Sequence, residues 1–338
     1  MSRVKFATNR LDLGGAVKFA NSAQRAERLG WHMGLIPCNP LKTVDPYVSL
    51  ALAAQKTTTL QLGTLLDTPI LRHPSVLAGS ISTVAELAPE RTHLGLGIGD
   101  TAVRFNGISP ATVNELKEAL VMTRDLLHGA KLEVGALKPA RLTHAKKVPV
   151  WVAAQGPRAL AMAGQYADGV WIRVGRNKEN LQLAWEAVCA GAKQAARRPQ
   201  DIKLGLILHT AYSENEENAR LMAKAVAAGY YEYSPHLFSN IGSRWDGPPA
   251  VELQPQVYPD FHHHRDMVHA GQVVSFLDDK VADEFALYGS WVQIQEQLQS
   301  VLDMGLPVSY VVPHPILEQN MEYDFLSLAA THLINQFG

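Results

Sequence analysis

Residues 45–100 read DPYVSLALAAQKTTTLQLGTLLDTPILRHPSVLAGSISTVAELAPERTHLGLGIGD and carry the strongest structural signal in the chain. The apolar runs LQLGTLL (60–66) and THLGLGI (92–98) flank a segment with helical spacing. Short apolar runs bounded by turn residues are typical of strands that are covered on both faces, as in parallel α/β sheets. Ligands of such sheets bind where the strands end at their carboxyl side. The small and polar residues that follow both runs therefore mark a candidate site.

The same alternation of strand-like and helix-like segments continues through the whole chain. It predicts eight strands, at residues 4–8, 33–36, 60–66, 93–97, 150–153, 169–172, 204–209 and 309–312. It predicts helices between them, among others at residues 15–29, 45–56, 75–87, 112–128 and 158–166. We expect Asp45 and the stretch Arg72-His73-Pro74 to cap the second and third of these helices. Eight strands separated by helices predict an α/β fold, the (β/α)8 TIM barrel.

Two segments are longer than ordinary loops. Residues 129–147 show no period, and residues 230–283 lie between the seventh and eighth predicted strands and are rich in Tyr, Pro, His and Trp. We expect residues 230–283 to be a partly helical insertion that roofs the barrel mouth. No composition break marks a second domain, so residues 1–338 are predicted to form a single domain.

Composition excludes several classes of protein. The formal net charge is −1 and the hydrophobic content is 47%, so nothing favours nucleic acid or an anionic membrane as a partner. No apolar run approaches the roughly 20 residues that span a bilayer, and the first residues lack the apolar core of a secretory leader. Cys38 and Cys189 are too few for a disulfide scaffold or a four-cysteine zinc site. We therefore expect a cytoplasmic protein.

The sequence AAQGPR (153–158) follows the fifth predicted strand and opens a helix. A helix start exposes backbone N–H groups and the positive end of the helix dipole, which favours a phosphate. Gly156 permits close backbone approach, and Pro157 suits the first helical turn. The alternative is a plain turn with a proline start. We interpret the stretch as a phosphate site.

A ladder of three glycines, Gly95, Gly97 and Gly99, lies at the end of the fourth predicted strand. Missing side chains could let a flat ring lie against this strand end. Close packing or a bulge explains such glycines as well. The spacing differs from the dinucleotide fingerprint GxGxxG, so no Rossmann site is indicated.

Eight stretches together carry a family resemblance. They are Gly63-Thr64, Thr68-Pro69, Arg72-His73-Pro74, Glu90-Arg91, LGLGIGD (94–100), GDTAVRFNGISPA (99–111), PVWVAAQGPRALAMAGQYADGVWI (149–172) and FALYGS (285–290). They resemble the luciferase-like flavin oxidoreductase superfamily, and within it the branch of F420-dependent methylenetetrahydromethanopterin-reductase-like proteins. FALYGS resembles the family's lead into its last helix.

The resemblance implies a hydride transfer between a reduced flavin-type cofactor, F420, and a small organic substrate. The cofactor then carries the reactivity, and the protein positions it and excludes water. The resemblance places the cofactor phosphate on Ala154, Gln155, Gly156, Pro157 and Arg158. It places the ring over Leu65 and Leu66, which a non-proline cis peptide bond joins in relatives, and against Gly97 and Gly99. Members of the family commonly pair through a helical face, so we expect a homodimer.

Three residues are candidates for catalytic work. Cys38 follows the second strand, where many relatives have an aspartate, and it could be a nucleophile or a small residue packed against the cofactor. His209 and His314 lie at the ends of the last two strands and could act as acids or bases. Other residues at strand ends have capping or salt-bridge roles as alternatives: Asn9, Asp67, Asp100, Arg104 and Arg173. The run His262-His263-His264 invites a metal, but three consecutive residues point in different directions, so we predict a solvated loop or helix start and no metal site. The alternative is that Tyr258, Phe261 and one of these histidines reach the substrate from the insertion.

Two other functions remain open. The same fold could bind FMN and activate oxygen as a luciferase-like monooxygenase, because both cofactors place a phosphate and a tricyclic ring similarly. The barrel could also have lost its cofactor and act as a non-catalytic partner protein. A purified protein that changes the fluorescence of neither F420 nor FMN would favour the last function.

Overall fold

The computed structural model describes residues 3–132, 138–319 and 324–338. The chain forms two compact units. We call residues 5–171 and 187–205 the N-terminal unit. We call residues 172–186 and 206–338, together with the residues up to Val4, the C-terminal unit. Each unit is described by itself.

The N-terminal unit contains a parallel sheet. Its strands are β1 (Lys5–Thr8), β2 (Met33–Ile36), β3 (Gln61–Thr64), β4 (Thr92–Leu96), β5 (Val150–Ala154) and β6 (Gly169–Ile172). Strands β1 to β5 pair in parallel in chain order, and β6 lies beside β5. The register places Ile36 beside Thr64, so β2 and β3 end at the same edge. The six predicted strands of this unit are confirmed to within one or two residues.

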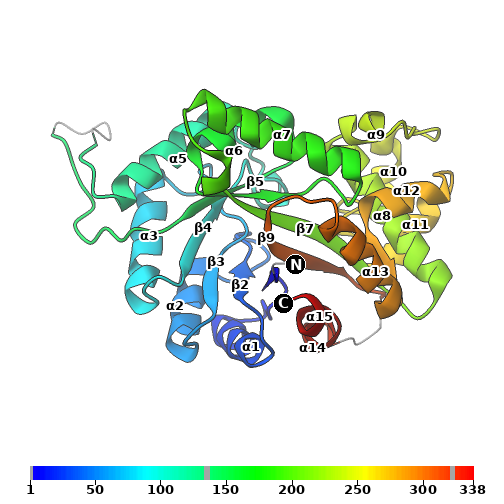
Figure 1. Cartoon of the computed structure of the whole chain (residues 1–338), viewed down its shortest axis with the longest axis horizontal. Helices are drawn as coiled ribbons and strands as arrows, with labels where there is room; N and C mark the ends of the chain where they lie inside the picture. Colours follow the sequence, from blue (N-terminus) through cyan, green and yellow to red (C-terminus); the bar gives the residue numbers. More distant parts are fainter. Residues whose placement is uncertain (1–2, 133–137, 320–323) are drawn as a thin grey trace. The chain divides into compact units, whose positions relative to one another are not determined.

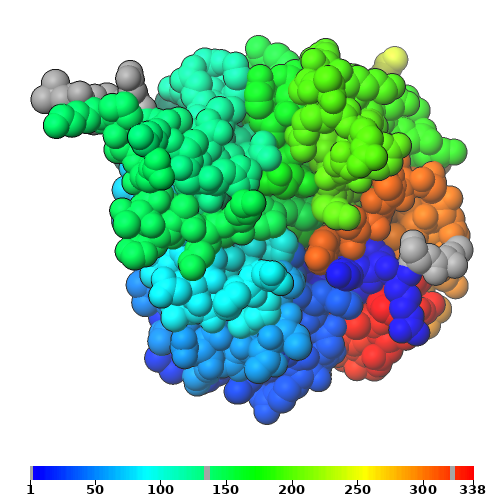
Figure 2. All heavy atoms as spheres, turned by 60° about the vertical axis from the view of Figure 1, so that its left-hand side comes forward, coloured from blue at the N-terminus to red at the C-terminus, as the bar shows by residue number. Residues whose placement is uncertain are grey.

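Helices follow these strands on the outside of the sheet, as Figure 1 shows for the first three. Figure 2 shows the outer surface that they form, in blue and cyan. The helices and helical turns of the N-terminal unit are α1 (Ala16–Arg28), α2 (Pro46–Lys56), α3 (Pro74–Leu87), α4 (Thr101–Arg104), α5 (Val113–Leu127), α6 (Pro157–Tyr166), the second half of α7 (Lys178–Gln194) and η1 (Pro199–Asp201).

The predicted caps are present. The Asp45 carboxylate accepts from the Tyr47 and Val48 N–H groups, and the His73 ring accepts from the Ser75 N–H. Proline occupies the first position of α2, α3 and α6, where its missing N–H costs no helical hydrogen bond. The short helix α4 was not predicted.

Stacked indoles fill the core behind β5 and β6. The Trp151 and Trp171 rings lie 4.6 Å apart, and both side chains are buried. A Cβ on Gly169 would meet Trp151 at 2.4 Å, and one on Gly205 would meet Trp171 at 2.2 Å. The glycines therefore make room for the two indoles.

The C-terminal unit contains β7 (Lys203–Tyr212), β8 (Leu287–Gly289) and β9 (Val308–Ile316). Strand β9 lies beside β7, as Figure 1 shows, and β8 pairs in parallel with the end of β7. The helices and helical turns are the first half of α7, α8 (Glu216–Tyr233), α9 (His236–Asn240), α10 (Ala250–Leu253), η2 (Gln254–Gln256), α11 (Met267–Val273), α12 (Asp279–Phe285), α13 (Trp291–Leu302), α14 (Phe325–Ala329), the π-turn η3 (Ala330–Ile334) and α15 (Asn335–Phe337).

In this half of the chain, one sequence prediction is confirmed and one strand was not predicted. Residues 230–283 are partly helical, as predicted, and contain α9 to α11 with parts of α8 and α12. The FALYGS stretch contains the unpredicted strand β8, which is only three residues long, before Ser290 caps α13. Residues 133–137 of the expected loop 129–147 lie outside the described residues. No helix in the described part of the chain is long and apolar enough to cross a membrane.

Candidate functional site

Strand β3 ends in a cis peptide bond between Leu65 and Leu66, at the position that the family resemblance implies. Backbone hydrogen bonds attach this bond to β2 on one side. The Leu65 N–H donates to the Ile36 carbonyl at 2.9 Å, and the Leu66 carbonyl accepts from the Cys38 N–H at 3.1 Å. We call residues 64–67 the cis segment.

The other side of the cis segment is attached to β4. The Asp67 N–H donates to the Gly95 carbonyl at 2.9 Å, and the Gly97 N–H donates to the Asp67 carbonyl at 3.0 Å. The Thr64 hydroxyl donates to the Gly95 carbonyl and accepts from the Gly95 N–H, both at 2.9 Å. The segment is therefore held between two strands, and its backbone position is well defined.

Packing against the cis segment explains the glycine ladder of β4. A Cβ on Gly95 would lie 2.2 Å from the Thr64 carbonyl oxygen, and one on Gly97 would lie 2.7 Å from the Leu66 side chain. Gly99 has a φ of 83°, a backbone conformation that favours glycine. Close packing, one alternative explanation of the ladder, is present at Gly95 and Gly97, and contact of these glycines with a ring remains a prediction.

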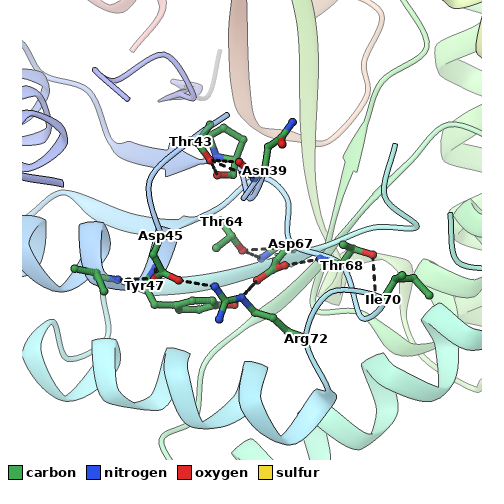
Figure 3. Close-up of polar contacts among 12 residues, drawn as sticks. Asn39, Thr43, Asp45, Tyr47, Thr64, Asp67, Thr68, Ile70 and Arg72 are labelled. Carbon is green, nitrogen blue, oxygen red and sulfur yellow. Dashed lines mark hydrogen bonds and ion pairs between the residues drawn. The ribbon is translucent and has the colours of Figure 1, made fainter. Parts of the chain in front are cut away.

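A buried carboxylate completes the cis segment (Figure 3). Asp67 is 0% exposed and accepts from the Tyr47 hydroxyl at 2.9 Å and from the Thr68 N–H at 2.7 Å. The Arg72 guanidinium lies 3.6 Å from Asp67 and 2.5 Å from Asp45. Burial raises the pKa of Asp67, and the hydrogen bonds to its carboxylate oppose that shift. The network fixes the chain that leaves the cis bond.

Cys38 lies beside this carboxylate, and its side chain is buried. Burial and the neighbouring Asp67 carboxylate raise the pKa of the Cys38 thiol to about 12. A thiol with such a pKa is neutral at physiological pH and serves as a weak donor to Asp67. This environment favours the packing role of Cys38 over the nucleophilic one.

Alkylation tests the state of the Cys38 thiol. In a Cys189→Ser variant, Cys38 is the remaining cysteine, and we expect iodoacetamide at pH 8 to modify it roughly a thousandfold more slowly than a free thiol of pKa about 8.5, because its thiolate fraction is that much smaller. Mass spectrometry over time measures the rate, with the urea-unfolded protein as the control. Comparable rates in folded and unfolded protein would show that Cys38 is reactive.

The loop between β5 and α6 presents an open helix start. Gly156 is the residue before the first turn, and no side chain of the described residues caps the helix there. A Cβ on Gly156 would meet nothing within 4 Å, and its φ of −83° does not require glycine. Arg158 is exposed at the same end. The N–H groups, the dipole and the open space fit a phosphate, and the fold itself gives no reason for this glycine.

The two candidate histidines lie side by side in the C-terminal unit. The His209 and His314 rings are 5.0 Å apart, and His262 stacks on His209 at 4.8 Å. The Tyr230 hydroxyl lies 3.1 Å from His209 Nδ1. We call these four rings, together with Arg173, the histidine cluster. The sequence placed three of its members at strand ends and left open that one histidine of the run 262–264 reaches the site. It missed Tyr230, whose burial depends on long-range packing.

His262 corrects the prediction of a solvated histidine run. Its side chain is 4% exposed, and its Nε2 lies 3.0 Å from the Val226 carbonyl oxygen of α8. His263 is exposed and pairs with Asp260 at 2.8 Å. Among the described residues no group of three His, Cys, Asp or Glu could hold a metal ion. The run thus turns one ring inward, and that ring belongs to the histidine cluster.

Asp100 and Arg104 make a surface ion pair at 3.2 Å, with 36% and 57% of their side chains exposed. Such a pair contributes little to stability, in the range of about 0–1 kcal/mol. This agrees with the salt-bridge alternative for these two strand-end residues.

Comparisons with known proteins show which family the chain belongs to. Residues 7–306 match the sequence profile of the luciferase-like monooxygenase family. The chain is 31% identical over 305 residues to 5,10-methylenetetrahydromethanopterin reductase of Methanolobus tindarius, which covers 86% of this chain and 88% of the relative. It is 30% identical over 236 residues to F420-dependent hydroxymycolic acid dehydrogenase of Mycobacterium tuberculosis, covering 65% of this chain and 64% of that one.

A solved structure shows the fold. The coenzyme F420-dependent tetrahydromethanopterin reductase of Methanopyrus kandleri matches with a TM-score of 0.77 at 21% identity, over 100% of both chains. The predicted (β/α)8 barrel is thereby confirmed, with β8 as an additional strand. With a profile match over most of its length, this chain belongs to the luciferase-like monooxygenase family.

Proposed function

We propose that this protein is an F420-dependent oxidoreductase that transfers a hydride between the cofactor and a small organic substrate. The observation that carries the proposal is the open start of α6, where Gly156 precedes the first turn and no side chain of the described residues caps the helix. The family resemblance places the cofactor phosphate at this helix start and the cofactor ring over Leu65 and Leu66. The names of two similar proteins, the F420-dependent hydroxymycolic acid dehydrogenase of Mycobacterium tuberculosis and the coenzyme F420-dependent reductase of Methanopyrus kandleri, support F420 as the cofactor.

In this proposal the protein binds and orients the cofactor for the reaction. Bound reduced F420 supplies the hydride. The start of α6 binds the phosphate through backbone N–H groups and Arg158, and the cis segment with Gly97 and Gly99 orients the ring. Because the Cys38 thiol stays protonated, we assign no base to the end of β2. His209 and His314 are the proposed groups that hold or move a proton.

FMN is the second candidate cofactor, since the family profile describes monooxygenases and FMN carries a comparable phosphate and ring. Equilibrium fluorescence titration of the protein with F420 and with FMN separates the two. We expect F420 to bind more tightly. Tighter FMN binding would favour the monooxygenase function, and binding of neither cofactor would favour a non-catalytic barrel.

The Gly156→Asp variant tests the phosphate site. A carboxylate at the open helix start should repel the phosphate and weaken F420 binding about 10- to 100-fold, the effect of a few kcal/mol of like-charge repulsion. Gly156→Ala is the matched control, because its Cβ meets nothing within 4 Å and adds no charge. F420 affinity that is unchanged in Gly156→Asp would remove the phosphate from this loop.

Three further points belong to the proposal. We propose that residues 1–338 act as one domain whose segment 230–283 covers the barrel mouth and selects the substrate. Exchanging that segment for the corresponding segment of a relative should change the substrate preference.

We propose a homodimer through the outer face of α2 and α3 (Figure 2), where Val48 and Val76 are 57% and 48% exposed. Sedimentation equilibrium of the protein and of a Val48→Glu variant tests the dimer. We propose a cytoplasmic location, which fractionation of cells tests.

A further inference from the structure

Arg173 follows β6 and carries a positive charge that no acidic residue in the described part of the chain pairs with. Within the described residues, its hydrogen bonds and ring contacts involve only His262 and Tyr230, and its Nε is buried without a partner. Other partly buried arginines are matched in one of two ways. Arg72, Arg124 and Arg176 each pair with an aspartate at 2.5 to 3.4 Å. Arg91 and Arg197 donate to backbone carbonyl oxygens instead. A guanidinium held next to neutral rings therefore requires an explanation.

His262 does not supply the missing negative charge. Its Nε2 must donate to the Val226 carbonyl oxygen, since a carbonyl has no proton to give. Its Nδ1 therefore accepts from the Arg173 guanidinium, at 2.5 Å. Burial and the Arg173 charge lower the pKa of His262 well below its usual value, so the ring is neutral.

Tyr230 does not supply a negative charge either. Burial raises the pKa of its phenol, so the hydroxyl keeps its proton. The oxygen accepts from Arg173 and from the Gly175 N–H, which leaves the proton for His209 Nδ1, 3.1 Å away. His209 is then protonated on Nε2, so neither Tyr230 nor His262 supplies a negative charge to Arg173.

We propose that Arg173, with His209 and His314 beside it, is an oxyanion-binding subsite for a carboxylate or phosphate group of the substrate. The guanidinium offers several N–H donors in a planar fork that matches both groups. The proposal rests on the proposed function only in assigning the anion to the substrate. It narrows the substrate class to anionic organic molecules.

Binding of simple anions by the cofactor-free protein tests the subsite. The probes are inorganic phosphate and acetate, added to a Gly156→Asp background so that the start of α6 does not contribute. The readout is the ring ¹H–¹⁵N NMR spectrum, assigned with His209→Gln and His314→Gln variants. We expect one or both anions to shift the resonances of His209, His262 and His314. Phosphate acting alone would indicate a phosphorylated substrate, and acetate acting alone would indicate a carboxylate.

The Arg173→Gln variant should bind the effective anion at least tenfold more weakly, whereas Arg265→Gln, at an exposed arginine of the same unit, should bind as the parent does. Arg173→Lys keeps the charge and should retain part of the anion affinity. Binding by Arg173→Lys would show that a substitution at this position does not unfold the protein, so that the loss in Arg173→Gln reflects the lost charge. Anion shifts that persist in Arg173→Gln, or their absence in the parent, would overturn the subsite. F420 titration of the wild-type protein tests the proposed function independently of this result.

Discussion

Replacing Gly95 by alanine is expected to lower the free energy of unfolding by about 3 kcal/mol, because the new side chain is forced against packed backbone. The added Cβ would lie 2.2 Å from the Thr64 carbonyl oxygen, and backbone atoms cannot rotate away as a side chain can. Strands β3 and β4 would have to separate where the cis segment begins. F420 affinity should therefore fall as well, and urea unfolding with cofactor titration measures both effects.

Gly79→Ala is the matched control for Gly95→Ala. Gly79 lies inside α3, and its Cβ would meet only a Leu142 side-chain carbon, at 3.9 Å. Alanine is favoured over glycine in a helix by up to about 1 kcal/mol, so this variant should be as stable as the wild type or more stable. A Gly95→Ala protein as stable as the Gly79→Ala protein would contradict the described packing of β3 on β4.

Acid should destabilise the protein through His93, by up to about 3 kcal/mol between pH 6.5 and 4. The His93 Nε2 donates to the Gln61 side-chain oxygen at 2.9 Å, and its buried Nδ1 has no hydrogen-bond partner among the described residues. Burial, with the charge of Lys5 as a smaller cause, lowers the pKa of His93 to about 4. The unfolded chain therefore binds a proton more readily than the folded one in this range, so stability falls as the pH falls.

The contribution of His93 is the difference in the pH dependence of unfolding free energy between wild type and His93→Gln. Other buried histidines such as His262 contribute equally to both proteins and cancel in this difference. Glutamine can still donate to Gln61 but does not titrate. We expect urea unfolding to show that His93→Gln loses less stability on acidification than the wild type does. His144→Gln, at an exposed position, should lose as much stability as the wild type. Identical pH dependence in wild type and His93→Gln would exclude His93 as the cause.

Local signals in the sequence predicted most of the fold. Asp45 before Pro46, and Gly156 before Pro157, mark helix starts within a few residues, so the predicted boundaries lie close to the observed ones. Strand β8 escaped prediction because three residues carry no measurable period. The barrel could be predicted because the alternating order of strands and helices is visible in the sequence itself.

The candidate site was predictable only in part. The cis bond at Leu65 and Leu66 followed from family resemblance, since apolar leucines give no local hint of it. The partners of Asp67 could not be foreseen, because Tyr47 lies 20 residues away and side-chain pairing depends on the assembled sheet. For the same reason His262 looked like part of a solvated run, although folding buries it.

The Cys38 thiol also constrains how this site can evolve. Its sulfur shares a hydrogen bond with a fully enclosed acid, so reinstating the aspartate of many relatives would bring two carboxyl groups together. Like charges at that separation cannot both ionise, and one acid would have to retain its proton at neutral pH. A single Cys38→Asp exchange is therefore expected to place a second, protonated acid beside Asp67.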